Sequence, residues 1–125
     1  MKLSSTEWTV MHVVWEKQPA SARDVHDRVT GETGWAFDTV RTILNRLTKK
    51  GALRSEVRSG TAYFTPLLSR EDARQSALSW IAEKAFGGAH EAMMQFLVSR
   101  RDLSRRERET LQRLLDEMDD QERKP

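Results

Sequence analysis

The sequence predicts a mainly helical protein that carries one small β-hairpin. Apolar residues recur at helical spacing in successive stretches, each bounded by a Ser or Thr cap, a glycine or a proline. The period changes to two only over 53–58 and 62–65, where Ser59-Gly60 supplies a turn. The predicted order is three helices, the hairpin and then further helices.

The first two helices are marked by their caps and their apolar stripes. Ser4 and Glu7 have the capping-box spacing, and the helix that follows them ends before Pro19. A second, short helix begins after Ser21 and ends by Gly31. The apolar stripes consist of Trp8, Met11, Val14 and Trp15, widened by Val10 and Val13, in the first helix, and of Val25 and Val29 in the second.

The third helix, 38–50, has an apolar back and a polar, basic front, and Gly51 ends it. The back consists of Val40, Ile43, Leu44 and Leu47, and the front of Asp38, Thr42, Asn45 and Lys49, with Arg41 and Arg46 beside it. Such a front suits the major groove of DNA. Helices two and three followed by a hairpin predict a winged helix-turn-helix domain over residues 1–68.

Residues 69–125 predict a C-terminal helical dimerisation region. Helices are expected after Ser69, around 93–98 and after Ser104, and Gly87-Gly88 separates the first two. Their apolar residues are too many for so small a region to bury alone, which predicts a dimer interface, with packing against the first domain as the alternative. The expected interface consists of Met93, Phe96, Leu97, Leu111, Leu114, Leu115 and Met118.

Charge is distributed unevenly along the 125 residues. The net charge is only +2, but residues 41–58 hold six Lys or Arg and a single acid. A local basic cluster is typical of a polyanion site, although a solvated charged face is the alternative. There is no cysteine, no apolar run of the roughly 20 residues that a membrane span needs, and no signal-peptide pattern. We therefore expect a soluble, cytoplasmic protein.

Side chains on the third helix and the hairpin are the candidate DNA contacts. We expect base contacts from Thr39, Thr42, Asn45 and Arg46. We expect phosphate contacts from Arg41, Lys49, Lys50, Arg54 and Arg58. An ordinary exposed helix face is the alternative, and Arg41 could instead form an internal salt bridge. Neither a catalytic constellation nor a metal-binding or cofactor-binding pattern is found, so we expect no enzyme, metal or cofactor.

Three segments resemble the penicillinase repressor (BlaI/MecI/CopY) family in order and spacing: Leu3–Met11 with Val14-Trp15, Thr39–Gly51 and Tyr63–Leu67. The resemblance covers nearly the whole chain. It implies a cytoplasmic bacterial transcriptional repressor that binds an inverted-repeat operator, commonly with a TACA/TGTA core, as a homodimer. The implied DNA-binding part is the winged helix, and the implied dimerisation part is the C-terminal helices.

The sequence departs from that family's pattern at informative places. The β-lactam-responsive members are cleaved at an Asn-Phe bond after a membrane sensor protease is activated, and Gln95-Phe96 stands at that position here. This bond is the candidate cleavage site, and such a protease is a candidate partner. The copper-responsive members carry Cys-x-Cys motifs, which this chain lacks. Phe37-Asp38 replaces a frequent Pro-Lys, and an acid there repels phosphate but can accept from a cytosine amino group.

A second class of function, protein binding or DNA binding without sequence preference, is also compatible with the sequence. Some winged helices bind other proteins or bind DNA without sequence preference, because a fold does not fix a function. The basic residues of 41–58 favour sequence-specific DNA binding over these alternatives.

Overall fold

The computed structural model describes residues 1–99, 104–107, 109 and 113, and the chain divides into two compact units. One unit comprises Leu3–Asp72, and the other comprises Met1–Lys2 together with the chain from Ala73 onward.

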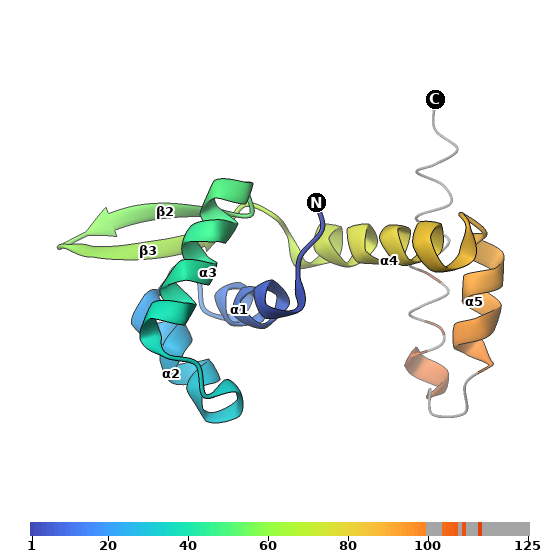
Figure 1. Cartoon of the computed structure of the whole chain (residues 1–125), viewed down its shortest axis with the longest axis horizontal. Coiled ribbons are helices and arrows are strands. Elements are labelled where there is room, and N and C mark those ends of the chain that lie inside the picture. The colour runs from blue at the N-terminus through green and yellow to red at the C-terminus, as the bar shows by residue number, and fades with distance from the viewer. Residues whose placement is uncertain (100–103, 108, 110–112, 114–125) are drawn as a thin grey trace. The chain divides into compact units, whose positions relative to one another are not determined.

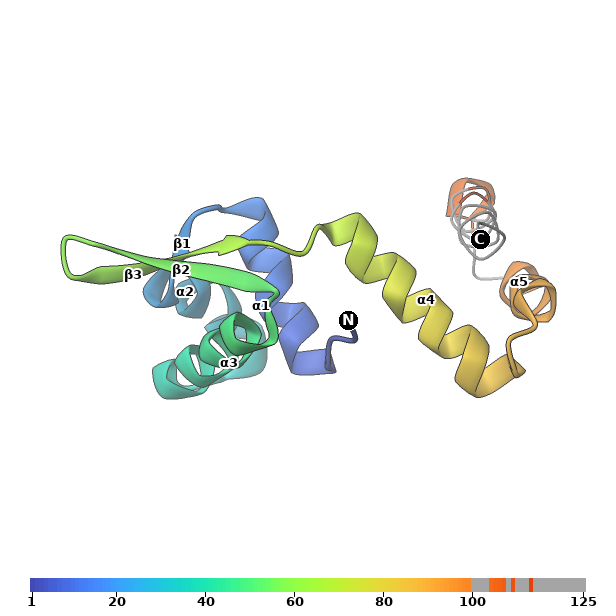
Figure 2. The ribbon, with the colours of Figure 1, turned by 90° about the horizontal axis from the view of Figure 1, so that it is seen from above.

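The unit Leu3–Asp72 is a winged helix-turn-helix, as the sequence predicts (Figures 1 and 2). Three helices pack together, and a long hairpin extends away from them. In chain order the elements are α1 (Ser5–Glu16), β1 (Ala20–Ser21), α2 (Ala22–Thr33), α3 (Phe37–Lys50), β2 (Leu53–Arg58) and β3 (Thr61–Pro66).

The sheet has three strands, whereas the sequence pattern predicts only the two of the hairpin. The extra strand, β1, pairs antiparallel with β3, and the strand order is β1-β3-β2. Ala20 lies opposite Phe64, so the short segment that joins α1 to α2 is fastened to the base of the hairpin. A strand of two residues is too short to show a period of two, which is why the sequence pattern contains no sign of it.

The second helix is longer than the sequence pattern predicts. It continues through Gly31 to Thr33 and ends at Gly34, whose φ of 67° is left-handed. A glycine is tolerated inside a helix at modest cost, whereas the left-handed residue that ends a helix is usually a glycine, so the later glycine is the true C-cap. The helix α3 likewise ends at a left-handed glycine, Gly51, with φ 90°, as predicted.

The core of this unit is formed by the predicted apolar stripes of its helices, except that Trp8 and Trp15 of the first stripe are only partly buried. The back of α3 is buried throughout, and the residues of α1 that face it are 0–8% exposed. The buried side chains of the two helices are Val10, Met11, Val13 and Val14 of α1 and Val40, Ile43, Leu44 and Leu47 of α3. Burial of these stripes fixes which face of α3 remains in solvent.

The second unit contains α4 (Arg70–Phe86), whose first residues belong to the other unit, and α5 (His90–Val98). Gly87 and Gly88 both have positive φ and separate the two helices. A small core is centred on Ala82 and Met93, which are fully buried. Among the described residues, no helix combines the length and the hydropathy that a membrane span needs.

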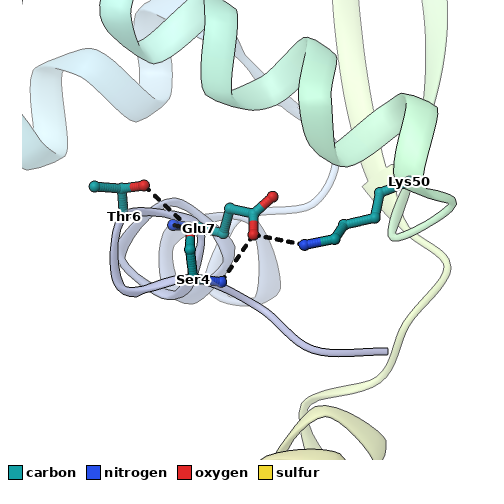
Figure 3. A network of polar contacts seen from close by, with 4 residues as sticks. All are labelled: Ser4, Thr6, Glu7 and Lys50. Carbon is teal, nitrogen blue, oxygen red and sulfur yellow. Dashed lines mark hydrogen bonds and ion pairs between the residues drawn. The ribbon is translucent and has the colours of Figure 1, made fainter.

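A buried carboxylate joins the start of α1 to the end of α3 (Figure 3). Glu7 is 1% exposed, and its Oε1 accepts hydrogen bonds from the Lys50 ammonium at 2.7 Å and from the Ser4 backbone N–H at 2.8 Å. The second bond belongs to the predicted capping box of α1. Burial by itself raises the pKa of Glu7, but the bonds from Lys50 and Ser4 outweigh it and hold that pKa below its usual 4.5.

We predict that Lys50→Met destabilises this fold much more than Lys49→Met. Removing Lys50 leaves the Glu7 carboxylate buried without its cation, while the Lys49 side chain is exposed. Because Lys50 itself is one-third exposed, we expect a loss of about 2 kcal/mol rather than the larger cost of a fully buried pair. Urea unfolding measures it, and equal losses in the two variants would contradict the role of the pair.

The lowered pKa of Glu7 also predicts a pH dependence of stability. The folded state binds fewer protons at Glu7 than the unfolded state does, so this group stabilises the fold above pH 4.5 and the stabilisation is lost as the pH falls below it. We expect the free energy of unfolding of Glu7→Gln to change less with pH across this range than that of the unsubstituted protein. Parallel pH profiles, measured by urea unfolding, would argue against it.

Candidate nucleic-acid interface

The solvent-facing side of α3 forms an exposed polar ridge. Every predicted contact on this helix has an exposed side chain, and among the described residues only Lys50 of these contacts has a buried acidic partner. The ridge consists of Asp38, Thr39, Arg41, Thr42, Asn45, Arg46 and Lys49. Asp38, Thr42, Asn45 and Lys49 recur every three to four residues along one side of the helix, and the other members lie beside them.

Thr42 is held in one orientation on this ridge. Its Oγ1 donates a hydrogen bond of 2.9 Å to the backbone carbonyl of Asp38, one turn earlier. The hydroxyl proton is therefore used within the helix, and the side-chain methyl group has a fixed position. A fixed methyl group suits an apolar contact, such as that with a thymine methyl, better than a donated hydrogen bond.

Two hollows lie on either side of the ridge. The hollow on the α1 side has a volume of about 360 Å³ and is lined by Thr6, Asp38, Thr39, Thr42, Ile43 and Arg46. The hollow on the hairpin side is larger, about 640 Å³, and lies between the first turn of α2, the ridge and β3. A projecting helix with a hollow on each side matches a major groove, which has a sugar–phosphate backbone along each edge.

The hairpin-side hollow contains two residues, Arg23 and Tyr63, that are not among the predicted DNA contacts. Arg23, from the first turn of α2, lies with its guanidinium 5.9 Å from the centre of the Phe37 ring. Tyr63 lines the same hollow from β3. One feature of the sequence indicates a role for Arg23. The Ser21 cap places Arg23 in the first turn of α2, where basic groups and backbone N–H groups can bind a phosphate.

The hairpin itself presents an exposed tip. Its turn is formed by Ser59 and Gly60, both with positive φ, as the sequence turn signal predicts. Val57 is 68% exposed, so only the first residue of β2, Leu53, contributes to the core. Arg54 and Arg58 are exposed on β2, and Arg58 lies 3.3 Å from Glu56. Neither arginine is among the residues that line the two hollows.

Two of the predicted phosphate contacts on α3 have acidic partners within the chain, as Arg58 of the hairpin also does. Lys50 is bonded to the buried Glu7, and Arg41 lies 3.4 Å from Asp38, which is the internal salt bridge named as the alternative for Arg41. Lys49 is exposed beside them. The phosphate roles of these residues remain predictions, with Lys49 the best placed of the three.

The expected dimer surface is described only in part. Met93 is fully buried against Ala82, and Leu97 packs on the same core, whereas Phe96 is 54% exposed. Trp80 and Ile81 of α4 add further exposed apolar area. The remaining predicted interface residues, Leu111, Leu114, Leu115 and Met118, lie outside the described residues.

The candidate cleavage bond, Gln95-Phe96, lies inside α5. Both residues are exposed, and both of their carbonyl oxygens accept hydrogen bonds from Ser99, at 3.0 and 2.8 Å. Within the part of the chain that the structure describes, no three His, Cys, Asp or Glu residues are grouped so that they could hold a metal ion.

Comparisons with known proteins agree with this geometry. The family model described as penicillinase repressor matches residues 3–117. The methicillin resistance regulatory protein MecI of Mammaliicoccus sciuri is 28% identical over 91% of this chain and 93% of its own. The penicillinase repressor of Bacillus licheniformis is 25% identical over 93% and 91%. Among solved structures, B. licheniformis BlaI in complex with the blaP half-operator matches with a TM-score of 0.51 and 29% identity, over 58% of this chain and 88% of that one.

Proposed function

The chain belongs to the penicillinase repressor family and is a DNA-binding transcriptional repressor, and we propose that it binds an inverted-repeat operator as a homodimer. The observation that carries this proposal is the exposed ridge of α3 with a hollow on each side. Two such ridges in one dimer would enter successive major grooves, and the spacing of the half-sites would follow from the dimer geometry.

Base recognition is assigned to the ridge. Thr39, Thr42, Asn45 and Arg46 supply methyl groups, an amide and a guanidinium, which match thymine, adenine and guanine edges respectively. Lys49 and the hairpin arginines are assigned to phosphates, which position the protein without selecting a sequence. Arg23 joins this second group because it lines the hairpin-side hollow.

Dimerisation is assigned to residues 69–125 and DNA binding to residues 1–68. The support for the first assignment is the apolar area that α4 and α5 leave exposed at Trp80, Ile81 and Phe96. Repression in the cytoplasm would follow from occupation of the promoter by the paired winged helices.

Relief of repression is assigned to cleavage at Gln95-Phe96, triggered by a membrane sensor protease. The bond is exposed, but it is part of a helix of nine residues whose N-cap, Ala89, makes no side-chain capping bond. A short helix without such a cap opens locally at low cost, which would give a protease the extended backbone it needs. Cutting there would separate Phe96 from α4 and weaken the dimer.

We predict different losses for two basic substitutions on the same helix. Arg46→Ala should weaken operator binding by about 1–3 kcal/mol and relax the preference at one base position. Lys49→Ala should weaken binding to all duplexes alike and lower the slope of log affinity against log salt by about 0.9 for each phosphate that is no longer neutralised. Gel-shift titrations on inverted-repeat and random duplexes at several salt concentrations measure both effects.

Arg28→Ala is the matched control for these titrations, because Arg28 lies on α2 and is paired with Glu16 at 3.1 Å. We expect it to leave affinity and salt slope unchanged. Unaltered base preference in Arg46→Ala would show that the ridge is wrongly assigned. Equal binding of the unsubstituted protein to both duplexes would favour an architectural or protein-binding role instead.

The dimer is tested by Phe96→Asp. A charge placed on this exposed ring position should disrupt an apolar interface and shift the mass in solution from twice 14.5 kDa toward 14.5 kDa. Leu67→Asp is the control, since Leu67 is 59% exposed in the other unit. Sedimentation equilibrium measures both, and an undisturbed dimer in Phe96→Asp would exclude α5 from the interface.

A further inference from the structure

One residue on the ridge does not fit a surface that binds a polyanion. Asp38, in the first turn of α3, carries a negative charge and is 83% exposed. A carboxylate at this place repels the phosphates on either side of the groove. The proposed function, on which this inference rests, gives the residue no role.

The fold has little need of this carboxylate. Asp38 Oδ1 lies 3.4 Å from Nη2 of Arg41, three residues later, and the Arg41 side chain is 60% exposed. Ion pairs as exposed as this one contribute little to stability. The α3 N-cap, Ala36, makes no side-chain capping bond, so a modest interaction of Asp38 with the helix dipole is the main structural alternative.

The Asp38–Arg41 pair places a hydrogen-bond acceptor, the carboxylate, beside hydrogen-bond donors, the guanidinium N–H groups. Both residues lie in the N-terminal part of α3. In recognition helices the N-terminal residues contact base edges. Asp38 lines the α1-side hollow, together with Thr39 and Thr42, whereas Arg41 lines the hairpin-side hollow, together with Asn45. Asp38 and Arg41 therefore lie on opposite sides of the ridge. With α3 in a major groove, the pair would face the base edges, between the two DNA backbones.

A C·G base pair offers the complementary pattern. In the major groove it shows the cytosine N4 amino donor next to the guanine O6 and N7 acceptors, and neither A·T nor T·A shows that arrangement. We propose that Asp38 and Arg41 together read one C·G base pair in each half-site, with the Asp38 carboxylate accepting from cytosine N4 and the Arg41 guanidinium donating to guanine O6 or N7. Arg41 is thereby moved from the phosphate contacts to the base contacts.

The same carboxylate discriminates against other sequences. Where no cytosine amino group faces it, Asp38 is brought into a dehydrated groove opposite acceptor atoms and phosphates, and that arrangement is unfavourable. Removing the charge should therefore have two effects of opposite sign. It should lower the preference for C·G at one position and raise the affinity for DNA of unrelated sequence.

The test is a selection of bound duplexes from a library with a randomised half-site, followed by titration of the selected duplexes. We expect the unsubstituted protein to prefer C·G at one position by about 5- to 100-fold. Asp38→Ala should reduce that preference below about two-fold at this position alone, and should bind random duplex more tightly than the unsubstituted protein does. Arg41→Ala should abolish the preference at the same position, and the double variant should show little further change, because the two residues act as a unit.

Asp27→Ala is the matched control, since Asp27 is an exposed aspartate on α2. It should leave the preference unchanged. If Asp38→Ala keeps the C·G preference and only lowers the midpoint of thermal unfolding, Asp38 supports the start of the helix and the inference is wrong. If the unsubstituted protein selects no sequence, the proposed function fails as well. If the unsubstituted protein selects a sequence but Asp38→Ala keeps the same C·G preference, only this inference is overturned.

Discussion

The buried Glu7 carboxylate is the constraint on which the DNA-facing geometry depends. It completes the capping box at the start of α1 and binds the ammonium at the end of α3, so a single side chain fixes both helices. Apolar packing alone permits small rotations and slides of one helix on another, because it is not directional. A buried ion pair tolerates far less displacement, and such pairs are best attested as devices that specify one arrangement. The hollow between α1 and the ridge is lined by Thr6 of α1 and by residues of α3, so its shape depends on how these two helices are placed.

Local signals in the sequence predicted most of this fold. The stripe and the basic front of α3 follow from a period of 3.6, and the capping boxes at Ser4 and Ser21 follow from spacings of three residues. The same holds for the cap at Ser104, where both bonds with Glu107 are formed. The strand β1 was missed because its partner, β3, is more than forty residues away and two residues carry no pattern. Pairing of that kind is decided by the tertiary structure.

The candidate site was predicted less completely than the fold, for a related reason. A helical projection places Lys50 at the edge of the exposed front, but a long flexible side chain reaches back to Glu7, 43 residues earlier in the chain. Sequence spacing likewise could not bring Arg23 and Tyr63 beside Asn45, since they come from α2 and β3. The ridge lies on one element, so the helical period alone predicted which of its residues are exposed.

The distribution of charge on the candidate interface favours selective DNA binding over high affinity for DNA of any sequence. Of the six basic residues in 41–58, Arg41, Lys50 and Arg58 have acidic neighbours within 3.4 Å. Over this fully described stretch, Arg46, Lys49 and Arg54 have no such neighbour among the ion pairs found.

Non-specific binding grows with each phosphate that is neutralised, so a monomer with few uncompensated cations binds random DNA weakly. In the proposed homodimer, pairing of two winged helices would restore affinity, but only on DNA that carries two correctly spaced half-sites. Under the proposed function, the acidic neighbours would make dimerisation and base recognition, rather than charge, the properties that determine where this repressor binds.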